Sequence, residues 1–133
     1  MENKIYRISA SGAEKIKNEL EVDQDAYLVI LDGSLYQSWN DYVNGMAQAF
    51  KFPKEPHYNV NAYLDWMTDL EWLNKEKYVL MIYHFDQFMQ EDAVLKKNLI
   101  TYFKEDILPF WEEEVTHTVV GGYPKSFNVY LVD

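Results

Sequence analysis

Three short runs of nearly continuous apolar residues divide the chain. They are Tyr27–Leu31 (YLVIL), Tyr78–Tyr83 (YVLMIY) and Phe127–Val132 (FNVYLV). Each run has the length of a strand and is rich in β-branched or aromatic residues, as expected where both faces of a parallel sheet are covered. Two more polar segments, Lys4–Ser9 and Val115–Val120, predict short strands at sheet edges.

Between these runs, apolar residues recur at every third or fourth position, the spacing that aligns side chains on one face of a helix. The first such segment follows Ser38, which can cap a helix, and it stops at Pro53. A second segment spans Val60–Trp72. A third segment, Gln87–Ile107, predicts a long helix that Pro109 should break or restart, because proline has no amide hydrogen to donate.

The alternation of strands and helices predicts an α/β fold with a mainly parallel sheet of about three strands, packed by helices in two layers. A short helix is expected at Ala13–Leu20, so residues 1–25 form an N-terminal extension that can add a further strand. No repeat, low-complexity block or linker divides the sequence. We therefore expect a single domain over residues 1–133.

Composition indicates how this domain folds and in which compartment it is expected. The chain has 133 residues, 48% of them hydrophobic, and no cysteine. Disulfides and thiolate metal sites are therefore excluded, and the domain should fold without a cofactor. The sequence has neither a secretion signal nor an apolar run approaching the roughly 20 residues of a membrane span. We expect a cytoplasmic monomer that does not enter a membrane.

The charge is strongly acidic, with 12 Lys and Arg against 22 Asp and Glu, which gives a net charge of −10. Such a chain repels nucleic acid phosphates and anionic lipid head groups. If charge selects a partner, that partner is a basic protein. The simpler alternative is that the acidity only maintains solubility.

The predicted helix at Val60–Trp72 has two different faces. One face carries an apolar stripe, and the other carries Asn61, Asp65 and Asp69, which lie four residues apart and so form a row. Trp66 flanks that row. Two carboxylates beside a half-exposed tryptophan are typical of an interface for a cationic surface, although an ordinary solvated helix face would look the same.

The order of short motifs resembles the barstar family of ribonuclease inhibitors. LDG follows the first buried strand, a capped helix and the dipeptide FP come next, and then NVNAYLDWM resembles the family pattern N-x-D-A-L-W-D. The strand YVLMIY, the long helix and the closing strand agree with that family in order and spacing. The resemblance covers roughly Tyr27 to Asp133 and implies a barstar-like fold.

In that family, the motif helix and the loop before it plug the active site of a secreted bacterial ribonuclease, with carboxylates where the RNA phosphates would lie. By this resemblance, Asp65 matches the central inhibitory aspartate. Asn59 and Ala62 match the asparagine and alanine of the motif. Asn61 stands where the motif has an aspartate, and Leu64 stands where it has a tryptophan.

The resemblance therefore implies an inhibitor or immunity protein that binds a basic partner, either such a ribonuclease or another toxin. His57 and Tyr58 lie where the family places contact residues just before the helix. The expected partner-binding residues are Asp65, Asp69, Asn61, Trp66, Asn59, Tyr58 and His57. The alternative is a non-inhibitory interaction module that binds another basic protein.

The sequence gives little support to catalysis. The histidines at positions 57, 84 and 117 are scattered, and no serine lies in a G-x-S-x-G elbow. Glu112, Glu113, Glu114 and His117 could offer ligands to a divalent metal, but a charged helix end explains them more simply. We expect neither enzymatic activity nor a bound metal.

Overall fold

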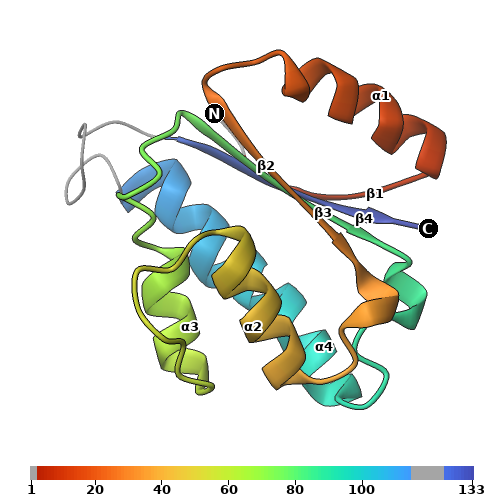
Figure 1. Cartoon of the computed structure of the whole chain (residues 1–133), viewed down its shortest axis with the longest axis vertical. Coiled ribbons are helices and arrows are strands. Elements are labelled where there is room, and N and C mark those ends of the chain that lie inside the picture. The colour runs from red at the N-terminus through yellow and green to blue at the C-terminus, as the bar shows by residue number, and fades with distance from the viewer. Residues whose placement is uncertain (1–2, 115–124) are drawn as a thin grey trace.

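A four-stranded sheet with all strands parallel forms the centre of the protein (Figure 1). The computed structural model describes residues 3–114 and 125–133. The strands are β1 (Ile5–Ile8), β2 (Ala26–Asp32), β3 (Lys77–Tyr83) and β4 (Ser126–Val132), in the order β1-β4-β3-β2. The three apolar runs and the N-terminal edge strand are thus confirmed, while the strand predicted at Val115–Val120 lies outside the described residues.

Helices lie on both faces of this sheet. They are α1 (Ala10–Glu21), α2 (Trp39–Ala49), α3 (Val60–Met67) and α4 (Ala93–Tyr102), with 3-10 turns η1 (Gly33–Leu35) and η2 (Phe85–Gln87) and π-helical segments η3 (Phe103–Ile107) and η4 (Phe110–Glu114). Figure 1 shows α2, α3 and α4 on one face and α1 on the other. Among the described residues, no helix combines the length and apolarity needed to cross a membrane.

The handedness of the connections explains this arrangement. The chain steps from β2 to β3 to β4 in one direction across the sheet, and from β1 to β2 in the opposite direction. Because crossovers between parallel strands are right-handed, α1 must cover the face that α2, α3 and α4 leave open. The α/β class is confirmed, and α1 adds a layer to the two that were expected.

Two apolar clusters hold these layers together. The larger one joins α2, α3 and α4 to the sheet, with fully buried aromatic side chains that include Tyr42, Tyr63 and Phe127. The smaller one lies under α1 and contains Ala13 and Met81. Aromatic residues fill much of the larger cluster, and Trp39 and Trp111 are buried in it at 5% and 2% exposure.

The long helix begins later than predicted, at Ala93 instead of Gln87. His84 and Met89 have φ angles of 50° and 52°, in the left-handed region that a helix cannot contain. The Met89 amide donates to the Tyr36 carbonyl at 2.9 Å, so this segment is a loop bonded to its neighbour. The buried residues of this loop follow the spacing of a helix, which explains why the predicted helix began too early.

Pro109 does not break this helix, contrary to the prediction. Leu108 and Pro109 are helical, and they lie between the π-helical segments η3 and η4. A π-helical turn bonds over five residues instead of four, and such widened turns accommodate local irregularities in a continuous helix. The missing amide hydrogen of Pro109 is therefore tolerated inside a helical path.

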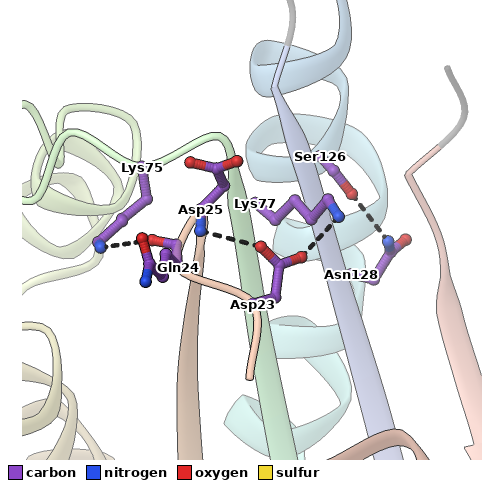
Figure 2. Close-up of polar contacts among 7 residues, drawn as sticks. All are labelled: Asp23, Gln24, Asp25, Lys75, Lys77, Ser126 and Asn128. Carbon is purple, nitrogen blue, oxygen red and sulfur yellow. Dashed lines mark hydrogen bonds and ion pairs between the residues drawn. The ribbon is translucent and has the colours of Figure 1, made fainter. Parts of the chain in front are cut away.

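Polar contacts fasten the turn before β2 to the start of β3 (Figure 2). Lys77 Nζ donates to Asp23 Oδ2 at 2.7 Å, and Asp23 Oδ1 accepts from the Asp25 amide at 2.9 Å. Lys75 Nζ donates to the Gln24 carbonyl at 2.8 Å. The hydrogen bond from Lys77 is the main reason that the pKa of Asp23 lies below its ordinary value.

Candidate functional site

Asn59 fixes the start of α3. Its side-chain oxygen accepts a hydrogen bond from the Ala62 amide at 2.8 Å, as expected of a helix N-cap. On the inner side of α3, Tyr63 and Met67 are fully buried. The helix is therefore held at its first turn and along its core face, while the side chains of Asn61 and Asp65 are exposed.

The end of α3 differs from the prediction, because the helix stops at Met67 and not at Trp72. Thr68 Oγ1 donates back to the Leu64 carbonyl at 2.8 Å, and Leu70 has a φ angle of 51°. Leu70 is fully buried, so after the end of the helix the chain turns and the Leu70 side chain packs in the core. The predicted helical row of Asn61, Asp65 and Asp69 is wrong for Asp69, which lies beyond the helix end.

The turn after α3 nevertheless returns Asp69 to the side of Asp65. Both line a pocket of about 240 Å³ together with His57, Ala62 and Trp66, which we call the Trp66–Asp69 pocket. Asp65 is exposed and Asp69 is half-buried, with its Oδ1 3.3 Å from the Glu71 amide. In the described part of the chain, neither carboxylate forms an ion pair.

Two aromatic side chains, Phe52 and Trp72, fix the indole of Trp66, which lines this pocket. The ring centroids of Trp66 and Phe52 are 5.5 Å apart with an interplanar angle of 24°, so the two rings stack. Trp72 meets Trp66 edge to face at 5.5 Å and 83°. Trp72 is anchored in turn, because its Nε1 donates to the Phe50 carbonyl at 2.9 Å.

The loop before α3 is tied to α2. The Tyr58 hydroxyl donates to Asn44 Oδ1 at 2.7 Å, and the Tyr58 carbonyl accepts from Trp39 Nε1 at 2.8 Å. The Tyr58 side chain is still 43% exposed, and His57 is exposed on the rim of the pocket. A further hollow of about 520 Å³ is lined by the end of α2 and by this loop, from Asn44 to Pro56.

The structure thus brings Asp65, Asp69, Trp66 and His57 to one pocket, and it leaves the other predicted residues outside it. Asn61 and Tyr58 lie at the surface nearby, and the Asn59 oxygen is engaged in capping. Sequence reasoning missed Phe52, whose stacking holds Trp66. The available signal was an aromatic residue directly before the helix-breaking Pro53.

The exposed groups of this site are suited to binding a partner. Among the described residues, no group of three or more His, Asp or Glu side chains could hold a metal ion. The proposed ligands Glu113, Glu114 and His117 have no described side chains, while Glu112 Oε2 accepts from the Asn3 amide at 3.1 Å. What the site presents is a rigid aromatic wall and two carboxylates that are available to an external cation.

Comparison with known protein families identifies the relationship. The sequence model of one family, described as Barstar (barnase inhibitor), matches residues 26–121. The chain belongs to the barstar family. The matched range includes α3, the loop before it and the whole Trp66–Asp69 pocket, whereas β1, α1 and β4 lie outside it. No curated protein and no solved structure is significantly similar to the chain.

Proposed function

We propose that this barstar-family protein is an intracellular inhibitor or immunity protein that blocks the basic active site of a bacterial ribonuclease or related toxin. The observation that carries the proposal is the pair of carboxylates of Asp65 and Asp69. They line one pocket, neither forms an ion pair among the described residues, and the inner face of the adjacent helix is fixed in the core. A ribonuclease active site is lined by cations that bind phosphate.

In this mechanism, α3 and the loop before it enter the active cleft as a preformed element. Asp65 takes the position of an RNA phosphate and pairs with the cations of the enzyme, while Asp69, Asn61, Trp66 and the loop residues His57 and Tyr58 complete the contact. The net charge of −10 steers the approach to a basic partner. Binding excludes RNA from the cleft. The complex forms in the cytoplasm, with one inhibitor for each enzyme.

Titration calorimetry against a barnase-type ribonuclease, at low and at physiological salt, tests this proposal. We expect one-to-one binding that weakens as salt rises, because exposed charges more than about 10 Å apart are screened at 0.1 M salt. A parallel assay should show loss of RNA cleavage at equimolar inhibitor. Absence of both binding and inhibition with a panel of such ribonucleases would refute the proposed target.

Asp65→Asn tests the role of the central carboxylate. Truncating one member of a buried charge pair at an interface costs about 2–5 kcal/mol, which corresponds to a roughly 30-fold to several-thousand-fold loss of affinity. The matched control is Glu14→Gln, which removes one charge from an exposed position on α1, on the opposite face of the sheet. If both variants bind like the wild type, Asp65 is not the inhibitory residue.

A non-inhibitory interaction module is the second candidate. The specific observation in its favour is Asn61, an uncharged side chain at an exposed position of α3 where the family motif carries an aspartate. One missing carboxylate weakens a site built for the phosphate-binding cations of a nuclease. Recovery of a basic protein without nuclease activity as the specific partner, with Asp65 needed for its binding, would favour this candidate.

A further inference from the structure

The negative charge of α3 is concentrated at one end of the helix. The residue nearest the start of the exposed face is the neutral Asn61, whereas Asp65 lies in the last turn and Asp69 just beyond it. The C-terminal end of a helix already carries a partial negative charge. Two carboxylates at this position repel that end, and a cation supplied from outside would relieve the repulsion.

The wall of the pocket at this end is aromatic and held in place. Trp66 is fixed by its stacking on Phe52 and by its perpendicular contact with Trp72. Because these contacts already restrict the indole, little side-chain freedom remains to be lost when a partner binds. Because Trp66 lines the same pocket as the two carboxylates, a cation that enters it can contact the indole and the carboxylates together.

The size of the pocket indicates a side chain as its occupant. Its volume of about 240 Å³ lies below the roughly 300–1,000 Å³ that is usual for small-molecule sites. Between the two basic side chains, the planar guanidinium stacks on aromatic rings and presents donors along several edges, whereas the ammonium is a compact point charge. Contact with an indole and with two separate carboxylates therefore favours arginine.

We propose that the Trp66–Asp69 pocket receives one arginine side chain of the partner protein, which makes Trp66 and Asp69 specificity-determining residues next to Asp65. This inference rests on the proposed function in so far as it assumes a protein partner with a basic surface. It goes further by placing the second charge contact after the end of α3, and not at Asn61 near its start. The pocket therefore selects a partner that carries an arginine facing the C-terminal end of α3.

The direct test uses a small probe and needs no identified partner. Isotope-labelled protein is titrated with N-acetyl-L-arginine N-methylamide, and chemical shifts are followed by NMR. We expect saturable shifts at the Trp66 indole N–H and at the amides of residues 65–69, with a Kd on the order of 10 mM because the contacts are solvent-exposed. The citrulline counterpart, which is neutral but similar in shape, should cause no saturable shift there.

Variants identify the groups responsible. Asp69→Asn and Trp66→Leu should each weaken arginine binding by about threefold or more, whereas Trp66→Phe retains an aromatic face and should restore most of it. Glu71→Gln is the matched control, because Glu71 is an exposed acid two residues from Asp69 that does not line the pocket. Each variant is accepted only if its remaining amide spectrum is unchanged.

The outcomes separate this inference from the proposed function. Arginine binding at the pocket without any ribonuclease binding would support the inference and refute the proposed target. Ribonuclease binding that depends on Asp65 but not on Asp69 or Trp66 would overturn the inference and leave the function intact. Equal shifts with the citrulline probe, or shifts spread evenly over other acidic residues, would also overturn it.

Discussion

Tyr42 and Tyr63 provide a test of how the core holds α3 in position. Their hydroxyl oxygens are 2.7 Å apart, and both side chains are fully buried. In the described residues, neither hydroxyl has another hydrogen-bond partner. Tyr63→Phe would leave the Tyr42 hydroxyl buried and unpaired, which costs about 1–3 kcal/mol. With a urea m-value of about 2 kcal/mol/M, the unfolding midpoint should fall by about 0.5–1.5 M.

The double variant Tyr42→Phe with Tyr63→Phe decides the cause. Replacing both partners of a buried hydrogen bond by apolar groups of the same shape can be nearly neutral. The double variant should therefore be more stable than the sum of the single losses predicts, by about 1 kcal/mol or more. If the losses simply add, the two hydroxyls do not depend on each other, and the reasoning from their isolation is refuted.

The same pair predicts a pH dependence. Burial is the main cause that raises the pKa of both phenols above the ordinary value of 10.0. The folded state therefore resists deprotonation, so stability is fully present below pH 10 and falls as pH rises from there towards the folded pKa. At about pH 11, the free energy of unfolding should be lower by roughly 1.4 kcal/mol for each of the two tyrosines. Urea titrations at several alkaline pH values should show a smaller loss for the double phenylalanine variant.

Three further changes probe the frame around the site. Asn59→Ala removes the cap of α3 and should lower the free energy of unfolding by about 1 kcal/mol, measured by urea titration; an unchanged midpoint would contradict the capping role. Gly33→Ala would place a Cβ 2.6 Å from the Tyr83 carbonyl oxygen and should cost about 1–3 kcal/mol, measured as a lower Tm. The pKa of Asp23 is lowered in the folded state, so its ionisation stabilises the fold above about pH 4, and this stability is lost on further acidification. Asp23→Asn should therefore make the free energy of unfolding less dependent on pH in the acidic range. Equal acid sensitivity of that variant and the wild type would argue against a stabilising Asp23 ionisation.

The strands could be predicted from the sequence because their signal is local. β3 is a short apolar run with Tyr78–Ile82 buried, as a strand covered on both faces requires, and β2 is a similar run at the edge of the sheet. The helix boundaries were less predictable, since Leu70, Phe88 and Met89 are buried in loops and imitate a helical stripe. Positive φ angles at Leu70 and Met89 end the periodicity without the glycine or proline that usually marks such a point.

The sequence indicated several residues that line the Trp66–Asp69 pocket, but not how they come together there. Asp65 and Asp69 were selected because four-residue spacing aligns side chains on a helix, yet α3 ends before Asp69. Both carboxylates still line one pocket, and between them the chain leaves the helix and buries Leu70. The position of Phe52 before Pro53 was a weak signal, but its stacking on Trp66 depends on the path of the loop, which the sequence does not give.

α1 lies on the face of the sheet opposite the proposed binding site. The right-handed connection from β1 to β2 places α1 on the face of the sheet opposite α3, where it covers Val79, Met81 and Val132. Its contacts therefore contribute to the stability of the sheet but do not reach the Trp66–Asp69 pocket. β1 and α1 also lie outside the range that matches the family. Changes in this N-terminal part should alter the free energy of unfolding and leave partner selection to α3, its preceding loop and the turn that contains Asp69.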